Sequence, residues 1–116
     1  MKLLTEQPRR LVYVACRLGG GNERARNLWE AQRWLAWAAA VGAAPVATWP
    51  VLGDTAAGEP RPEWHEVAEA LIRRSDEFWL CGKDVSAPEL QREWQVAERW
   101  GLTVRRFEHR TDEVAP

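Results

Sequence analysis

Four short apolar segments alternate with three helical patterns along the chain, and this alternation restricts the fold more than any other feature. The apolar segments are 10–16, 44–49, 77–81 and 102–107, and the helical patterns cover 23–41, 63–74 and 86–100. Apolar runs bounded by turn residues are typical of strands that are buried on both faces of a parallel sheet. Strands that alternate with helices predict an α/β fold with right-handed crossovers. We therefore expect a flavodoxin-like or Rossmann-like three-layer sandwich with a four-stranded parallel sheet of order 2-1-3-4.

Length and composition are those of one globular domain, with a core that we place at residues 10–107 and flexible termini. The chain has 116 residues, of which 46% are hydrophobic and 28% charged, a balance that excludes a disordered chain. A net charge of −1 does not provide the excess positive charge that binds a nucleic-acid polymer or an acidic membrane surface. No apolar run approaches the ~20 residues that span a bilayer. We expect a cytoplasmic protein without a nucleic-acid or membrane partner.

The numbers of cysteines and tryptophans limit which bonds and contacts the chain can form. Cys16 and Cys81 are the only cysteines, too few for a disulfide framework and without metal-ligand spacing. We expect them to be reduced, to lie on neighbouring strands, and to leave the chain without a metal site or cofactor. Eight tryptophans exceed what so small a core takes easily, so some are expected in a cleft or a subunit interface. A wide apolar face on the helix 23–41 likewise suggests a homodimer or higher homo-oligomer.

The expected strand order places a ligand site where the sheet direction reverses, at the carboxyl ends of the first and third strands. The loops 17–22 and 82–86 meet there, and both precede helix N-termini, which favour anions. The first loop contains three glycines but no phosphate-loop motif. Ser86 and Glu89 have the spacing of a capping box, which predicts the start of the third helix.

Glu93 is the carboxylate that stands out on that third helix. It lies beside the apolar face and lacks a cation one turn away, whereas Glu89 has Arg92 three positions on. A carboxylate on a half-buried face without a local partner is a candidate working group. The alternative is a side chain that points to solvent or pairs with a distant arginine such as Arg17 or Arg105.

Four segments in order resemble one family. They are VYVACRLGGGN (12–22), GAAPV (42–46), SDEFWLCG (75–82) and SAPELQREWQVAERWGLTV (86–104). Together they are similar to the nucleoside 2-deoxyribosyltransferase-like superfamily, most of all to its small bacterial and phage members, over residues 10–107. The resemblance implies one flavodoxin-like domain covering 1–116 and chemistry at an N-glycosidic bond.

The resemblance also implies roles for particular residues. Glu93 falls at the position of the glutamate that attacks the anomeric carbon, and Tyr13 at that of a strand aromatic near the sugar and the glutamate. The places that hold a substrate phosphate are taken here by Arg17, Gly19, Gly20, Gly21, Asn22 and Ser86. Active members carry an aspartate where this chain has Ala68, with Glu66 or Glu69 nearby as substitutes. The turn after Ser86 is Ala-Pro-Glu where active members tend to have glycine.

Three functions are compatible with these observations. The first is an N-glycosidase or deoxyribosyltransferase that acts on nucleosides or nucleoside monophosphates through Glu93. The second is a non-catalytic module that binds or senses a nucleotide. The third is a homo-oligomeric interaction protein that assembles through its tryptophan-rich helices.

Overall fold

A computed structural model of the chain describes residues 8–18, 21–48 and 62–110. It contains a four-stranded parallel sheet of order β2-β1-β3-β4, as the sequence predicts. The strands are β1 (Leu11–Cys16), β2 (Ala44–Val46), β3 (Glu77–Cys81) and β4 (Thr103–Phe107). The helices are the short η1 (Gly21–Glu23), α1 (Arg24–Ala40), α3 (Pro62–Arg74) and α4 (Pro88–Arg99). The sequence also predicts a long loop rich in glycine and proline at 50–62, and all of this segment except Pro62 falls outside the described residues.

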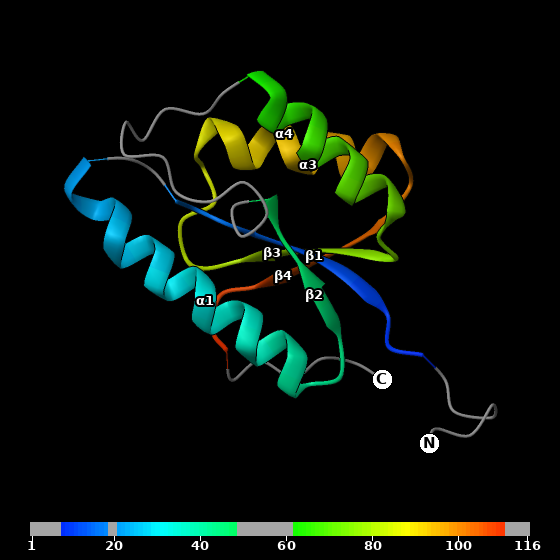
Figure 1. Cartoon of the computed structure of the whole chain (residues 1–116), viewed down its shortest axis with the longest axis horizontal. Helices are drawn as coiled ribbons and strands as arrows, with labels where there is room; N and C mark the ends of the chain where they lie inside the picture. The colour runs from blue at the N-terminus through cyan, green and yellow to red at the C-terminus, as the bar shows by residue number, and fades with distance from the viewer. Residues whose placement is uncertain (1–7, 19–20, 49–61, 111–116) are drawn as a thin grey trace.

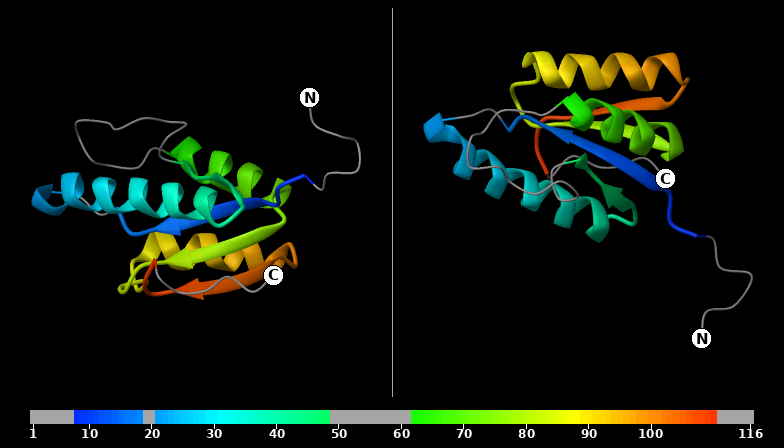
Figure 2. Two further views of the ribbon diagram at one scale, coloured as in Figure 1. Left: turned by 90° about the horizontal axis from the view of Figure 1, so that it is seen from below. Right: turned by 45° about the horizontal axis from the view of Figure 1, so that its top comes forward.

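The helices cover the two faces of the sheet unequally. Helix α1 lies on one face, while α3 and α4 pack against each other on the opposite face (Figure 1). The strand arrows point toward the end of the sheet where α1 and α4 begin (Figure 2). Both helix N-termini therefore lie at the carboxyl edge of the strands, where parallel α/β sheets bind ligands. Within the described residues, no helix is both long and apolar enough to cross a membrane.

The core under α1 is aromatic. Trp37 contacts Trp34, Trp79 and Phe107, with ring centroids between 5.2 and 5.7 Å apart and inclined geometry. Inclined pairs at this separation are the favourable arrangement for aromatic rings. Trp34 is buried in this cluster, so it stabilises the monomer and is not available as a subunit contact.

The remaining described tryptophans are divided between core, cleft and surface. Trp94 packs against the core under α3 and α4, and Trp64 lines a cleft. Trp29 and Trp100 are 54% and 45% exposed, and each ring carries an arginine guanidinium over its face. The expectation that some tryptophans lie outside the core is confirmed, but oligomeric state stays a prediction.

The core under α3 and α4 is built around Tyr13 and Phe78, whose rings stack with centroids 5.6 Å apart. Both side chains are fully buried on neighbouring strands, together with Ile72 and Leu80. Because side chains alternate along a strand, Tyr13 faces α3 and α4 while its neighbours Val12 and Val14 face α1. The phenol hydroxyl is thereby directed to the same side of the sheet as α4.

The register of β1 and β3 places Cys16 directly opposite Cys81, and both are free thiols. This confirms the predicted neighbourhood of the two cysteines and the order of the strands. Burial, followed by a hydrogen bond with Cys16, raises the pKa of the Cys81 thiol. Cys81 is thus an unreactive core thiol at neutral pH.

Two predicted boundaries are wrong. Strand β2 ends at Val46 and not at Trp49, because the chain leaves the edge of the sheet and Thr48 turns its hydroxyl to Tyr13. The capping box is also wrong: α4 starts at Pro88 with Ala87 as N-cap and without a side-chain cap. Ser86 stands one residue before the N-cap, where its amide and hydroxyl both donate to Asp84 in a local turn.

At the opposite, amino end of the strands, Glu77 is a buried carboxylate with three donors. Arg10 and Arg105 bind its two oxygens, the latter at 2.8 Å, and the Trp79 indole donates at 2.9 Å. Burial opposes ionisation, but the bonds from Trp79, Arg105 and Arg10 outweigh it, so the pKa of Glu77 is lowered. This cluster ties β1, β3 and β4 together and is far from the carboxyl edge.

Candidate functional site

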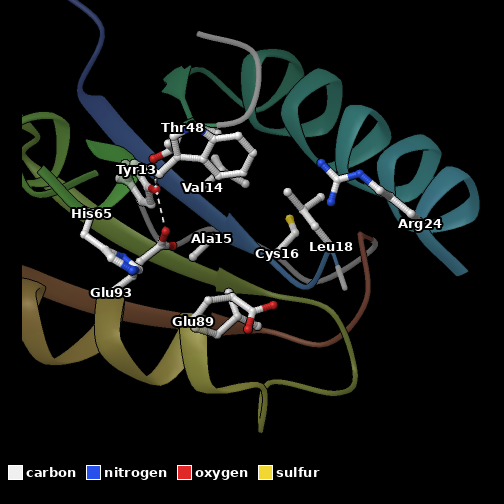
Figure 3. Close-up of a pocket in the computed structure, with 13 residues that line it drawn as sticks. Tyr13, Val14, Ala15, Cys16, Leu18, Arg24, Thr48, His65, Glu89 and Glu93 are labelled. Carbon is white, nitrogen blue, oxygen red and sulfur yellow. Dashed lines mark hydrogen bonds between the residues drawn. The ribbon is translucent and has the colours of Figure 1, made fainter. Parts of the chain in front are cut away.

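A cleft of about 240 Å³ lies over the carboxyl half of β1 (Figure 3). Strand β1 forms its floor, and side chains from α1, α3, α4 and the segment after β2 form its walls. The lining residues are Tyr13, Val14, Ala15, Cys16, Leu18, Arg24, Ala47, Thr48, Trp64, His65, Glu89, Leu90 and Glu93. The mixture of apolar walls with a few convergent polar groups is typical of a small-molecule site.

Glu93 projects into this cleft from α4. The Tyr13 hydroxyl donates a hydrogen bond to Glu93 Oε2 at 3.0 Å (Figure 3). Leu90 and Ala97, one turn to either side, are buried against the sheet and hold this face of the helix in place. The helix therefore fixes the carboxylate over β1, as a positioned reactive group requires.

The environment of Glu93 changes its proton affinity. Burial raises its pKa, the hydrogen bond from Tyr13 opposes that rise, and the negative charge of Glu89 adds to it, giving a pKa of about 7. Both protonation states are populated near neutral pH. A carboxylate in a cleft with its pKa shifted in this way is a candidate for a catalytic group.

A second hydroxyl completes the hydrogen-bonded chain. Thr48 Oγ1 lies 2.6 Å from the Tyr13 hydroxyl, and both residues are buried. Burial, and next the charge of Glu93, raise the pKa of Tyr13 well above its ordinary value. Tyr13 therefore remains a protonated donor to Glu93, with Thr48 as its partner on the other side.

The two arginines considered as distant partners of Glu93 are engaged elsewhere. Arg17 forms ion pairs with Asp84 at 2.9 Å and with Glu23 at 3.1 Å. Arg105 binds Glu77. The position of Glu93 in the cleft is consequently set by helix packing and Tyr13.

Of the residues expected to hold a phosphate, Arg17, Gly21, Asn22 and Ser86 belong to the described part of the chain, and none of them is among the residues that line the cleft. Arg17 follows β1 and Ser86 precedes α4, and the ion pair between Arg17 and Asp84 joins these two loops. Asn22 is exposed in η1, which begins at Gly21. Gly19 and Gly20 lie outside the described residues, so their part in a phosphate site stays a prediction.

Helix α3 contributes two residues that the sequence analysis did not assign to the site. Its cleft-facing side chains are Trp64 and His65, whereas Ala68 is buried and Glu66 is exposed. The Arg92 guanidinium contacts the His65 ring, in place of the expected pair between Arg92 and Glu89. His65 lies one helical turn before Ala68, the position at which the resemblance implies an acidic residue. This helical spacing from Ala68 could have indicated that His65 faces the site.

Thr48, Glu89 and Arg24 were also missed. Thr48 follows the end of β2, and residues just after a strand of a parallel sheet lie at the edge where ligands bind. Because the strand was predicted to run to residue 49, Thr48 was counted as part of it and was not considered for the site. Glu89 was assigned to the capping box, but it lines the cleft beside Glu93. Arg24, the first residue of α1, directs its side chain toward the cleft (Figure 3).

The chemistry available in the cleft is that of carboxylates, a phenol, a hydroxyl, a thiol, an imidazole and a guanidinium. In the described part of the chain, no three His, Cys, Asp or Glu side chains are grouped so that they could hold a metal ion. The arrangement suits nucleophilic or acid–base work by Glu93 on a polar ligand.

Comparisons with known proteins identify a related fold. No protein-family model matches the sequence, and no curated protein matches it. The structure is similar to that of a 2-deoxyribosyltransferase from the psychrotolerant bacterium Bacillus psychrosaccharolyticus, with a TM-score of 0.63 and 14% sequence identity. The match covers 90% of this chain and 77% of the transferase. The likeness shows that the two proteins share an α/β fold with a flavodoxin-like arrangement.

Proposed function

We propose that this protein cleaves or exchanges the N-glycosidic bond of nucleosides, with Glu93 as the nucleophile. The observation that carries the proposal is the position of Glu93 in the cleft, bonded to Tyr13 and with a pKa of about 7. The structural likeness to a 2-deoxyribosyltransferase supports the same class of substrate.

The reaction follows from the chemistry of the bond. A Glu93 oxygen forms a bond to the anomeric carbon while the bond from that carbon to the base nitrogen breaks. The base leaves with the bonding electrons and takes up a proton from solvent, and the attacking water or second base returns a proton to solvent in the next step. The transition state resembles an oxocarbenium ion, which an adjacent carboxylate stabilises. Water or a second base then displaces Glu93 from the sugar. Tyr13 holds the carboxylate in the direction of attack.

The protonation state of Glu93 controls the rate in this scheme. Only the ionised form attacks, and a pKa of about 7 keeps a large fraction of it available at neutral pH. The raised pKa also makes the carboxylate more basic, and hence a better nucleophile, than an exposed glutamate. The rate of base release should therefore rise with pH through about 7.

The test is to incubate the purified protein with deoxynucleosides, with and without an acceptor base, and to separate the free bases by chromatography. We expect base release by the wild type and its loss in Glu93→Gln. The matched control is Glu98→Gln, which removes a charge from the exposed side of the same helix. Base release that persists in Glu93→Gln would refute the role of Glu93. A ligand that raises Tm without yielding base would instead favour the non-catalytic binding module.

A further inference from the structure

Cys16 and Cys81 are nucleophilic groups that the proposed reaction does not use. They are directly paired residues of the adjacent parallel strands β1 and β3, and both are free thiols. A hydrogen bond joins the two side chains, so the thiols are already in contact. Both pack against the core under α1, which means that they point to the same face of the sheet.

The separation of the two strands suits a disulfide bond. Neighbouring strands lie about 4.8 Å apart, and the Cα atoms of a disulfide are usually about 4.4–6.8 Å apart. The register therefore places Cys16 and Cys81 within the required range. Rotation about the two Cα–Cβ bonds then brings the sulfur atoms to bonding distance.

The two thiols differ in their access to solvent. Cys16 is partly exposed and lines the cleft, where Figure 3 shows its sulfur atom between Ala15 and Leu18. Cys81 is only 1% exposed, so a reagent that enters the cleft reaches Cys16 first. The order of events follows from this difference: Cys16 reacts with an external oxidant, and Cys81 reacts afterwards with Cys16.

We propose that Cys16 is a site of oxidation by hydroperoxides and that Cys81 is its resolving thiol, so that the pair closes to a reversible disulfide beneath the cleft. The Cys16 sulfur attacks one oxygen of hydrogen peroxide, the O–O bond breaks, and a sulfenic acid and one molecule of water form. The Cys81 sulfur then attacks the Cys16 sulfur, the S–O bond breaks, and the hydroxide that leaves takes the Cys81 proton as water. In total the two thiols lose two electrons and two protons, and the peroxide is reduced to two molecules of water.

The pairing also assists the second step. Burial raises the pKa of Cys81, and the hydrogen bond with Cys16 and the negative charge of Cys16 add to that rise. A sulfenic acid at Cys16 is uncharged, so this charge no longer opposes ionisation of Cys81, and the attack is intramolecular because the two side chains are in contact. Closure then competes with further oxidation to sulfinic acid, which would leave a permanent negative charge in the cleft.

The test is to treat the purified wild type with hydrogen peroxide, block free thiols with iodoacetamide, digest with trypsin and analyse the peptides by mass spectrometry without reduction. We expect the peptides 11–17 and 75–83 as one linked species that dithiothreitol separates. In Cys81→Ala, Cys16 should instead proceed to sulfinic acid, which dithiothreitol does not reverse. In Cys16→Ala, Cys81 should stay a free thiol because it is buried.

Two unmodified thiols in the wild type, at a peroxide concentration that oxidises free cysteine completely, would overturn the proposal. Sulfinic acid at Cys16 of the wild type, or a disulfide between two copies of the chain, would overturn it as well. The disulfide does not depend on the function proposed above, but its consequence for catalysis does: dithiothreitol should restore base release to the oxidised wild type and not to oxidised Cys81→Ala. If no variant yields base, the proposed function fails while the linked peptides still decide the role of the cysteines.

Discussion

Replacing Glu93 by glutamine should stabilise the protein at neutral and alkaline pH while removing its activity. The unfolded chain loses this proton near the ordinary pKa of 4.5, but the folded chain keeps it up to about pH 7. Between these values the folded state binds more protons, so the free energy of unfolding falls as pH rises. The glutamine side chain in Glu93→Gln does not titrate, and its amide oxygen can still accept the hydrogen bond from Tyr13.

The size of the effect follows from the same values. A rise of the pKa from 4.5 to about 7 corresponds to roughly 3 kcal/mol, since one pKa unit is worth about 1.4 kcal/mol. Glu93 is partly exposed at the cleft surface, and solvent screening reduces this figure to about 1–2 kcal/mol. We therefore expect Glu93→Gln to be as stable as the wild type at pH 4 and about 1–2 kcal/mol more stable at pH 8.

Urea unfolding of both proteins at pH 4, 6 and 8 measures this difference, because other titrating groups contribute equally to each. Glu98→Gln is the control and should show no comparable gain with pH. A Glu93→Gln variant that is less stable than the wild type at pH 8, or a difference that does not change with pH, would contradict the desolvated state of Glu93.

Four further substitutions test other parts of the structure. Tyr13→Phe removes the donor to Glu93, so the midpoint of the pH–rate profile should move up by about one unit; an unchanged midpoint would exclude the contact. Glu77→Gln should lower stability at pH 7 by about 2–4 kcal/mol. Because the folded pKa of Glu77 is lowered, this loss should shrink as pH falls below 4.5, as urea unfolding would show. Trp34→Ala should cost about 3–5 kcal/mol and Trp29→Ala less than about 0.5 kcal/mol; equal costs would contradict their different burial.

The fold could be predicted because its signals are local. The five residues of β3 are all buried, and a short apolar run reports such a strand directly. Gly42 and Gly101 both adopt positive φ at the ends of helices, which few other residues tolerate. Alternation of strands and helices then left few topologies.

The site could be predicted only in part because its contacts join distant segments. Helical spacing located Glu93, but its bond to Tyr13 spans 80 residues and the bond from Thr48 to Tyr13 spans 35. No periodicity reports such pairs. The predicted start of α4 was wrong for a local reason: Asp84 accepts hydrogen bonds from the Ser86 amide and hydroxyl, and this turn holds Ser86 outside the helix.

The central claim is that the Glu93 carboxylate forms a covalent bond to the anomeric carbon of a nucleoside sugar. A deoxynucleoside that carries an electron-withdrawing fluorine at C2 slows the release of the sugar from the enzyme and favours trapping, because the oxocarbenium-like transition state is destabilised. Mass spectrometry of the denatured and digested protein should find the sugar on the peptide that contains Glu93, and no adduct in Glu93→Gln. Base release without an adduct, or an adduct on a residue other than Glu93, would contradict the account.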